Sequence, residues 1–314
     1  MPDPVHIISE KTGKPAWFDL QNVAAYAQWR DWKLANCLLE PQDLCVPVSD
    51  AYQLSSIEVA EMSKRLRTMN MVIYQITKGE IEGKQLVREL GMRFALRELD
   101  NNLCSDEDSI TSLQVVEGGR HKNYIPYTNR GLSWHTDGYY NAPDRQIHAI
   151  VMHCVRDAAS GGENLLLDHE MAYIHLRDHN PAYISALMHD QAMTIPPNTE
   201  EGAERGATTG PVFSVHQETG SLHMRFSARK RNIEWRDDPL TMEAIDCLNA
   251  FLASNTPYII HYRLKPGEGI ISNNVLHNRT AFNDTAEQKR LLYRARYFDR
   301  VGETGFEAIK IEVK

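Results

Sequence analysis

The side chains best suited to chemistry in this chain are His135, Asp137 and, far along the sequence, His277. Two histidines and one carboxylate make the facial triad that binds Fe(II) on one face and leaves the other coordination positions open to substrate-like ligands and O2. On a β-strand, residues i and i+2 point the same way, so His135 and Asp137 can reach one ion while Thr136 turns into the opposite layer. The spacing therefore predicts a metal site built from one strand and a distant histidine.

A His-X-Asp pair alone is a weak signal in a chain with 13 histidines. Further motifs accompany this pair in a fixed order along the chain. They are Gly161-Gly162-Glu163-Asn164 with Asp168, then Pro266-Gly267-Glu268-Gly269 and Ser272-Asn273-Asn274 ahead of His277, and finally Arg290. The ordered set resembles the Fe(II)/2-oxoglutarate-dependent oxygenases of the taurine dioxygenase and gamma-butyrobetaine hydroxylase type, and it extends from Tyr124 to Asp299.

The resemblance implies that His135, Asp137 and His277 hold Fe(II) and that Arg290 binds the distal carboxylate of the cosubstrate 2-oxoglutarate. The planar fork of arginine suits bidentate carboxylate binding. Where taurine-type enzymes place Thr, this chain has Asn164, whose amide can donate the same hydrogen bond. The implied reaction hydroxylates a C–H bond of a small molecule, consumes O2 and releases succinate and CO2.

The segment from Arg290 to Tyr297 alternates between two faces, one apolar or aromatic and the other carrying Arg290, Arg294 and Arg296. A solvated strand face is one explanation of the three arginines. If the face looks into the core instead, each guanidinium needs an anion, because an unpaired buried arginine is costly. The resemblance favours the second explanation and places Arg294 where the taurine enzyme binds the anionic group of its substrate.

Aromatic and polar residues around the metal motif are candidates for substrate binding. They are Tyr127, Tyr139, Tyr140 and Asn141, with Trp134 and Tyr124 nearby. Such a density suits a cage for a quaternary ammonium group or a platform for a flat ring, and ordinary core packing explains part of it. With Arg294 on the other side, we expect a small polar substrate that is anionic or zwitterionic.

The pattern along the chain predicts a mainly β fold with flanking helices and a double-stranded β-helix (jelly-roll) core. Residues 1–108 are expected to form a helical N-terminal cover in the same domain, with a capping box at Ser55. Residues 109–314 are expected to form the catalytic core, with helical insertions near 168–189 and 239–254. The second insertion is expected to begin with Asp238 as its cap and Pro239 in its first turn. The stretch Asn198 to Gly210 is expected to be a flexible loop, with a lid as one option.

Composition restricts the partners. The 314 residues carry a net charge of −8 with both signs interspersed, so nucleic acid is not expected as a partner. No apolar stretch is long enough for a bilayer, which predicts a soluble, cytoplasmic protein without a membrane partner. Five cysteines without a Cys-X-X-Cys motif predict free thiols in a reducing compartment. The oligomeric state stays open, a homo-oligomer included.

Other polar residues favour ordinary roles. His148 and His153 should face opposite sides of a strand. The basic group at Arg225, Arg229, Lys230 and Arg231 should be a solvated hairpin edge, with contact to an anionic substrate as the alternative. Two alternative functions remain open. A non-redox, cupin-like isomerase or lyase using zinc or manganese would not need Arg290, and a non-catalytic ligand-binding family member would not bind iron.

Overall fold

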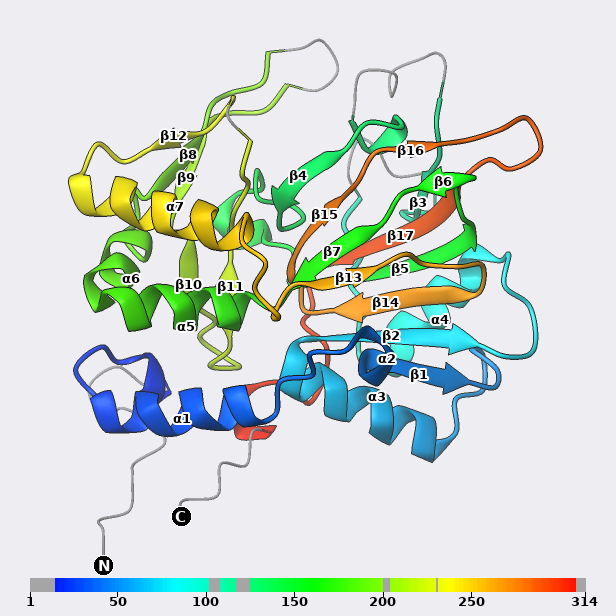
Figure 1. Ribbon diagram of the computed structural model, residues 1–314, viewed down its shortest axis with the longest axis horizontal. Coiled ribbons are helices and arrows are strands. Elements are labelled where there is room, and N and C mark those ends of the chain that lie inside the picture. The colour runs from blue at the N-terminus through cyan, green and yellow to red at the C-terminus, as the bar shows by residue number, and fades with distance from the viewer. Residues whose placement is uncertain (1–14, 102–107, 117–124, 200–203, 230, 309–314) are drawn as a thin grey trace, which may run out of the picture.

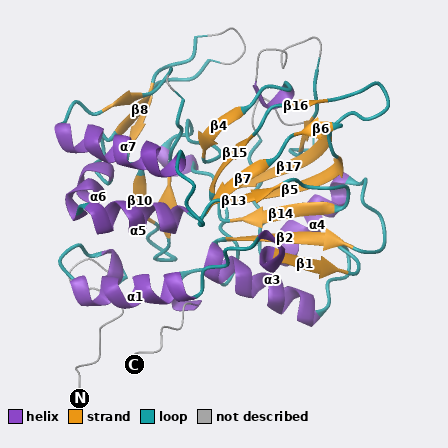
Figure 2. Cartoon of the chain, viewed as in Figure 1, coloured by secondary structure: helices purple, strands orange, loops and turns teal. Residues whose placement is uncertain are grey.

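The computed structural model describes residues 15–101, 108–116, 125–199, 204–229 and 231–308 (Figure 1). The helices are α1 (Val23–Ala35), α2 (Pro41–Leu44), α3 (Ser56–Met69), α4 (Lys84–Arg93), α5 (His169–His179), α6 (Pro181–Leu187) and α7 (Pro239–Leu252). The strands are β1 (Cys45–Val48), β2 (Met71–Ile76), β3 (Thr111–Leu113), β4 (Leu132–His135), β5 (Ala149–Arg156), β6 (Ser160–Gly161), β7 (Asn164–Leu167), β8 (Met193–Ile195), β9 (Thr208–Gly210), β10 (Phe213–Val215), β11 (Leu222–Met224), β12 (Glu234–Trp235), β13 (Ile260–Tyr262), β14 (Glu268–Ser272), β15 (Leu276–Arg279), β16 (Phe282–Asn283) and β17 (Leu291–Tyr297). The strands of the two larger sheets lie mainly on one side of the molecule, with α5, α6 and α7 and small strands such as β8 and β10 on the other (Figure 2).

The largest sheet has six strands in the order β1-β2-β14-β5-β17-β3. Its strands alternate between two apolar layers, as the period of two requires. Val72 and Val151 belong to the layer that packs under α3 and α4, whereas Ile73 and Met152 belong to the opposite layer. Both faces of this sheet are therefore buried.

A second sheet, in the order β13-β7-β15-β4, is antiparallel throughout. Leu166, Ile260 and Val275 from this region share one hydrophobic cluster with Met152 and Leu292 of the large sheet. That cluster joins the two sheets. Arg294 and Arg296 point from β17 to the same face as Leu292, because residues two apart on a strand share a face.

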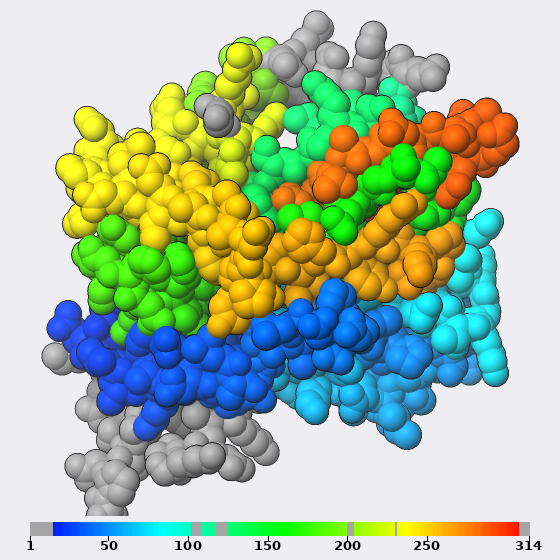
Figure 3. Space-filling model, viewed as in Figure 1, coloured from blue at the N-terminus to red at the C-terminus, as the bar shows by residue number. Residues whose placement is uncertain are grey.

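The helices α1, α5 and α7 form a third cluster with the small strands β8, β10 and β11, in which Trp29, Tyr173 and Phe213 are fully buried. A polar connection crosses this region. Lys33 of α1 forms buried ion pairs with Asp168, at 2.6 Å, and with Glu170, so α1 is tied to the start of α5. In the space-filling view the N-terminal residues form a continuous band along one side of the molecule (Figure 3).

Several expected elements are confirmed. Ser55 and Glu58 form the reciprocal capping box of α3, and Asp238 caps α7 with Pro239 in its first turn. The insertion after Asp168 is helical but divides into α5 and α6, because Asn180 leaves the helical region and caps the second helix. The N-terminal region also supplies β1 and β2, which helical periodicity did not predict. Within the described ranges, every helix is too short or too polar to cross a bilayer.

Candidate functional site

Two neighbouring strands bring the predicted metal ligands together. His277 of β15 pairs directly with His135 of β4 in antiparallel register, and their rings lie 4.3 Å apart. Asp137 follows β4, and its carboxylate joins the two imidazoles in a cluster whose ligand atoms lie within 4.8 Å of one another. Thr136 turns away and accepts a hydrogen bond from the Phe226 backbone at 3.1 Å. The alternation predicted for this segment is confirmed.

Each histidine is fixed in the orientation that a metal ligand needs. The Nδ1 atom of His135 lies 2.8 Å from the Ser133 carbonyl oxygen, and that of His277 lies 2.9 Å from the Val275 carbonyl oxygen. A carbonyl only accepts, so both Nδ1 atoms carry the hydrogen and both Nε2 atoms keep a free lone pair. Burial, with the neighbouring His277, lowers the pKa of His135 to about 3, so its ring is neutral at pH 7.

Asp137 is held as a carboxylate by arginines of β17. The Arg294 Nη1 atom donates to its two oxygens at 2.9 and 3.3 Å, and Arg296 lies 3.9 Å away. Burial alone would favour the protonated acid, but these two cations outweigh it and hold the pKa of Asp137 below its usual range. The triad therefore consists of two neutral imidazoles and one anion, a donor set that suits Fe(II).

The backbone of Asp137 is clamped by Asn274. The Asn274 side chain accepts from the Asp137 N–H at 2.8 Å and donates to the carbonyls of Asp137 and Ile147 at 2.9 and 2.6 Å. Asn274 itself has a φ of 51°, a conformation that asparagine tolerates well. Because it lies in the turn before His277, Asn274 couples the two arms of the triad.

The chain of contacts continues outward from Arg296. Its guanidinium pairs with the buried Asp100 and donates to the Tyr140 hydroxyl at 2.7 Å. Tyr140 also packs edge-on against Tyr139, whose ring lies 6.5 Å from that of His135. The predicted substrate residues Tyr139 and Tyr140 are thus connected to the metal triad from two sides.

Arg290 stands apart from this paired network. It is 4% exposed and stacks on Phe282 at 5.1 Å. Of the six buried arginines in the described part of the chain, it is the one whose guanidinium makes no hydrogen bond. Burial lowers the pKa of Arg290 to about 10, which leaves it charged at pH 7. A buried cation of this kind calls for an anionic ligand.

A narrow cavity surrounds the Arg290 guanidinium. Asn164, Gly162 and Leu292 line it, together with the ion pair between Arg263 and Asp157 at 3.0 Å. Asn164 is buried and its amide makes one long hydrogen bond, 3.4 Å, to the Tyr262 carbonyl. Gly162 has a φ of 73°, and a Cβ there would lie 3.7 Å from Arg290. The structure brings Asn164 and Arg290 to one cavity, and both side chains can donate hydrogen bonds to a carboxylate.

A larger pocket of about 460 Å³ opens beside Tyr140. Its wall includes Asn141, Arg145, Arg205 and Phe298, and the Arg145 guanidinium lies 4.0 Å from the Phe298 ring centroid. Residues 205–208 of the expected loop belong to this wall, whereas residues 200–203 lie outside the described part of the chain.

The remaining predicted residues lie elsewhere. Tyr127 is 3% exposed and belongs to the cluster between the sheets. Trp134 is also buried, while Tyr124, Cys104 and Lys230 lie outside the described residues. Arg225 corrects an expectation: it is no solvated hairpin edge. It is buried and donates to backbone carbonyls, among them those of Tyr139 at 2.8 Å and Thr208 at 2.9 Å.

Three supporting residues were not predicted from the sequence. Asn274 belongs to a polar run before His277, and this run could have indicated a supporting role. Its hydrogen bonds to Asp137 and Ile147, however, depend on the folded turn. Asp100 gave no signal, because its partner Arg296 is distant in the chain. Gly138 has a φ of 68°, and a Cβ would lie 2.4 Å from Ile147, so the turn after Asp137 requires glycine.

Comparisons with known proteins agree with this geometry. The family model described as taurine catabolism dioxygenase TauD, TfdA family matches residues 84–296. A uridine-5'-phosphate dioxygenase from Amycolatopsis sp is 31% identical over 180 residues, which cover 54% of this chain and 62% of that protein. One with the same name from Streptomyces sp is 29% identical, with 62% and 71% covered.

The match to the first of these relatives spans under two thirds of that protein's length. Among solved structures, asparagine oxygenase in complex with Fe(II), hydroxyasparagine and succinate superposes with a TM-score of 0.56 at 15% identity, covering 93% of this chain and 87% of that one. This likeness shows a shared fold. Because the family model covers more than half of the chain, the protein belongs to the TauD/TfdA dioxygenase family.

Proposed function

We propose that this protein is a non-haem Fe(II), 2-oxoglutarate-dependent oxygenase that hydroxylates a C–H bond of a small anionic metabolite and releases succinate and CO2. The observation that carries the proposal is the combination of a convergent triad with Arg290, a buried cation whose guanidinium makes no hydrogen bond to any residue that the structure describes. A metal site alone fits many enzymes. The unpartnered cation adds the requirement for a carboxylate ligand that this class of oxygenase uses.

Each part of the site has a separate task. When bound, iron supplies the activation of O2, and His135, Asp137 and His277 would hold it. Arg290 and Asn164 would bind the far carboxylate of 2-oxoglutarate. Asn274 and Arg294 keep Asp137 in place and ionised. The protein's contribution is therefore binding, orientation and control of protonation.

The proposed fold of the catalytic core is a double-stranded β-helix. The supporting observation is that two sheets, β1-β2-β14-β5-β17-β3 and β13-β7-β15-β4, share one buried cluster. His135 and His277 lie on β4 and β15 of one sheet, and Asp137 follows β4. Arg294 and Arg296, which face Asp137, come from β17 of the other sheet. On this basis we propose that the reaction takes place between the two sheets.

The large pocket beside Tyr140 is the proposed substrate site. Arg145 and Arg205 supply positive charge, while Tyr140 and Phe298 supply aromatic surfaces. The carboxylate of Asp100 also lines this pocket, and its charge is balanced by the ion pair with Arg296. We assign Arg294 to Asp137 rather than to the substrate, so the expectation of an anionic substrate now depends on Arg145 and Arg205.

The names of two relatives suggest a specific compound for this pocket. Both are uridine-5'-phosphate dioxygenases. A nucleoside monophosphate combines a flat ring with an anionic group, and arginine binds phosphate oxygens well. Pockets of 300–1,000 Å³ commonly hold ligands of about this size. We therefore propose a phosphorylated nucleoside, or an anion of similar size carrying a ring, as the substrate class.

Substrate-triggered O2 consumption with succinate formation tests the proposal. The panel comprises uridine-5'-phosphate, uridine, amino acids, taurine, betaines and neutral terpenoids, each with Fe(II) and 2-oxoglutarate. Stimulation by phosphorylated compounds and not by their dephosphorylated forms is expected. Stimulation only by neutral, apolar compounds would refute the anionic substrate, and failure to bind Fe(II) would favour a non-catalytic binding protein. Turnover of a substrate without O2 would favour the isomerase or lyase alternative.

A further inference from the structure

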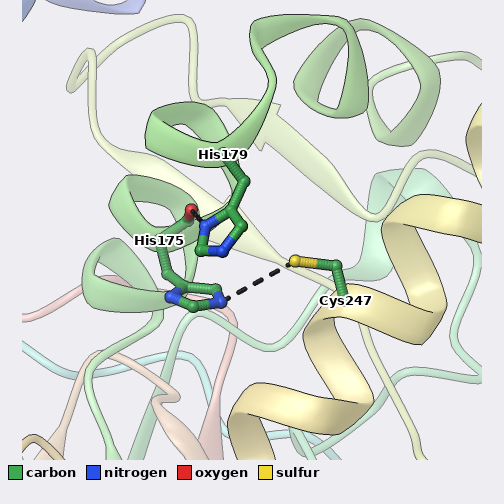
Figure 4. Close-up of side chains that lie close together, drawn as sticks. All are labelled: His175, His179 and Cys247. Atoms are coloured by element: carbon green, nitrogen blue, oxygen red, sulfur yellow. Dashed lines mark hydrogen bonds between the residues drawn. The ribbon is translucent and has the colours of Figure 1, made fainter.

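A second cluster of metal-ligating side chains lies between two helices of the third hydrophobic cluster. His175 and His179 occupy positions i and i+4 of α5, and Cys247 faces them from α7 (Figure 4). Their ligand atoms lie within 4.8 Å of one another. No residue of this cluster belongs to the iron triad, the Arg290 cavity or the Tyr140 pocket.

The distances suit a tetrahedral zinc ion. The Cys247 Sγ atom lies 3.7 Å from the His175 Nε2 atom. With Zn–S of about 2.3 Å and Zn–N of about 2.0–2.1 Å, sulfur and nitrogen ligands at a tetrahedral angle are about 3.6 Å apart. The two atoms are therefore already at the separation that one shared ion would impose.

The imidazoles are oriented by the helix itself. The His179 Nδ1 atom lies 2.9 Å from the His175 carbonyl oxygen, so Nδ1 carries the hydrogen and Nε2 is the free donor. The His175 ring stacks on Phe251 at 3.9 Å, which holds it toward α7. Both rings point toward the Cys247 sulfur in the close-up view (Figure 4).

The donor set selects the metal. One thiolate with two imidazoles favours zinc over calcium and magnesium, which prefer oxygen. His179 is exposed and the other two residues are half-buried, so a water can fill the fourth position. The iron triad contains a carboxylate and no sulfur. The two sites can therefore be distinguished by the chemistry of their ligands.

We propose that His175, His179 and Cys247 bind a Zn²⁺ ion that clamps α5 to α7. The segment α5 follows β7, which begins with Asn164 of the Arg290 cavity, and α7 leads to β13, the neighbour of β7. The clamp joins the helices that precede and follow these paired strands. Its expected effect is on stability, with no part in the oxygenase chemistry.

Cobalt substitution tests the site directly. Full-length protein is stripped with a chelator and titrated with Co²⁺, because a Co²⁺–thiolate bond gives a near-ultraviolet charge-transfer band that the sulfur-free iron triad cannot produce. We expect the band in wild type and in His277→Ala, its displacement by Zn²⁺, and a rise in melting temperature with Zn²⁺. Cys247→Ser should remove the band and weaken Zn²⁺ binding at least about 100-fold, since even indirect contacts to a metal are worth about 10–100-fold.

Two further variants make the result unambiguous. Cys37→Ser is the matched control, since Cys37 is also a half-buried free thiol, and it should keep the band. His179→Ala changes an exposed side chain, so it should fold normally and still lose Zn²⁺ affinity. No thiolate band with excess Co²⁺, or a band that survives in Cys247→Ser, would overturn the proposal and leave a weak hydrogen bond between Cys247 and His175.

Discussion

Arg290, just before β17, and Arg294 and Arg296, within it, differ in what balances their charge. Arg294 and Arg296 are buried against the carboxylates of Asp137 and Asp100, which the protein itself supplies. Arg290 is as deeply buried, and among the described residues its guanidinium has no hydrogen-bond partner. The paired arginines hold a metal ligand in position, whereas the unpaired one marks the place where an anion must come from solution.

The largest expected effect comes from removing a metal ligand without touching either arginine group. His277→Ala should lower 2-oxoglutarate turnover by at least about 100-fold, because the triad loses a direct ligand. Circular dichroism should show an intact fold. Succinate formation measured by chromatography checks the prediction, and full turnover in this variant would remove His277 from the metal site.

Arg290→Ala tests the unpaired end of the comparison. We expect 2-oxoglutarate binding to weaken by about 2–5 kcal/mol, the range for truncating one partner of a desolvated charge pair. Arg290→Lys should recover only part of this loss, because it lacks the bidentate fork. The cosubstrate-free variant should be no less stable than wild type, since a buried cation without a partner has been removed. An unchanged KM for 2-oxoglutarate would contradict the assignment.

Arg294→Ala tests the paired end and should behave in the opposite way. Loss of this cation raises the pKa of Asp137 and leaves a buried carboxylate poorly balanced, so the metal-free protein should become less stable. In wild type this stabilisation is present above the ordinary carboxyl pKa and is lost as the pH falls from there through the lowered pKa of folded Asp137. Fe(II) affinity should drop about 10- to 100-fold. A higher substrate KM with unchanged iron affinity would instead make Arg294 a substrate residue.

A buried histidine, unlike a buried arginine, can become neutral near pH 7, so its burial makes the stability of the protein depend on pH. Burial, with the nearby His216, lowers the pKa of His148 from 6.5 to about 4. The unfolded chain then binds more protons between these values, so stability should rise as the pH increases from about 4 to 6.5. His148→Gln should reduce that rise by about 1–3 kcal/mol in urea unfolding.

The smallest expected effect concerns the rim of the substrate pocket. Arg145 is more than half exposed, with a side-chain exposure of 58%, so its charge is screened by solvent. Arg145→Ala should weaken the binding of an anionic substrate by about 1 kcal/mol or less, which would appear as a small rise in the KM for that substrate. The KM for 2-oxoglutarate should not change. An equal rise in both constants would mean that Arg145 acts on the fold rather than on the substrate.

The sequence predicted what depends on local periodicity. Alternation placed His135 and Asp137 on one face and put Arg294 and Arg296 together on another, and both placements hold in the fold. Cap chemistry located the starts of α3 and α7 correctly. These features are set by neighbouring residues, so one segment carries enough information.

The partners of the buried charges could not be predicted in this way. Asp100 pairs with an arginine far along the chain, and Arg225 finds backbone carbonyls rather than solvent. The short strand β1 gains its place only by pairing with β2, so its own four residues carried little signal. Such features depend on contacts between segments that lie far apart in the sequence, and the local pattern of residues does not reveal these contacts.

Anaerobic titration of the metal-free protein with Fe(II) and then 2-oxoglutarate tests the proposed oxygenase most directly. Chelation of the iron by the keto acid should give a visible metal-to-ligand charge-transfer band in wild type. The band should require a much higher 2-oxoglutarate concentration in Arg290→Ala and should be absent in His277→Ala. Iron-loaded wild-type protein that gives no band at saturating 2-oxoglutarate would contradict an oxygenase of this class.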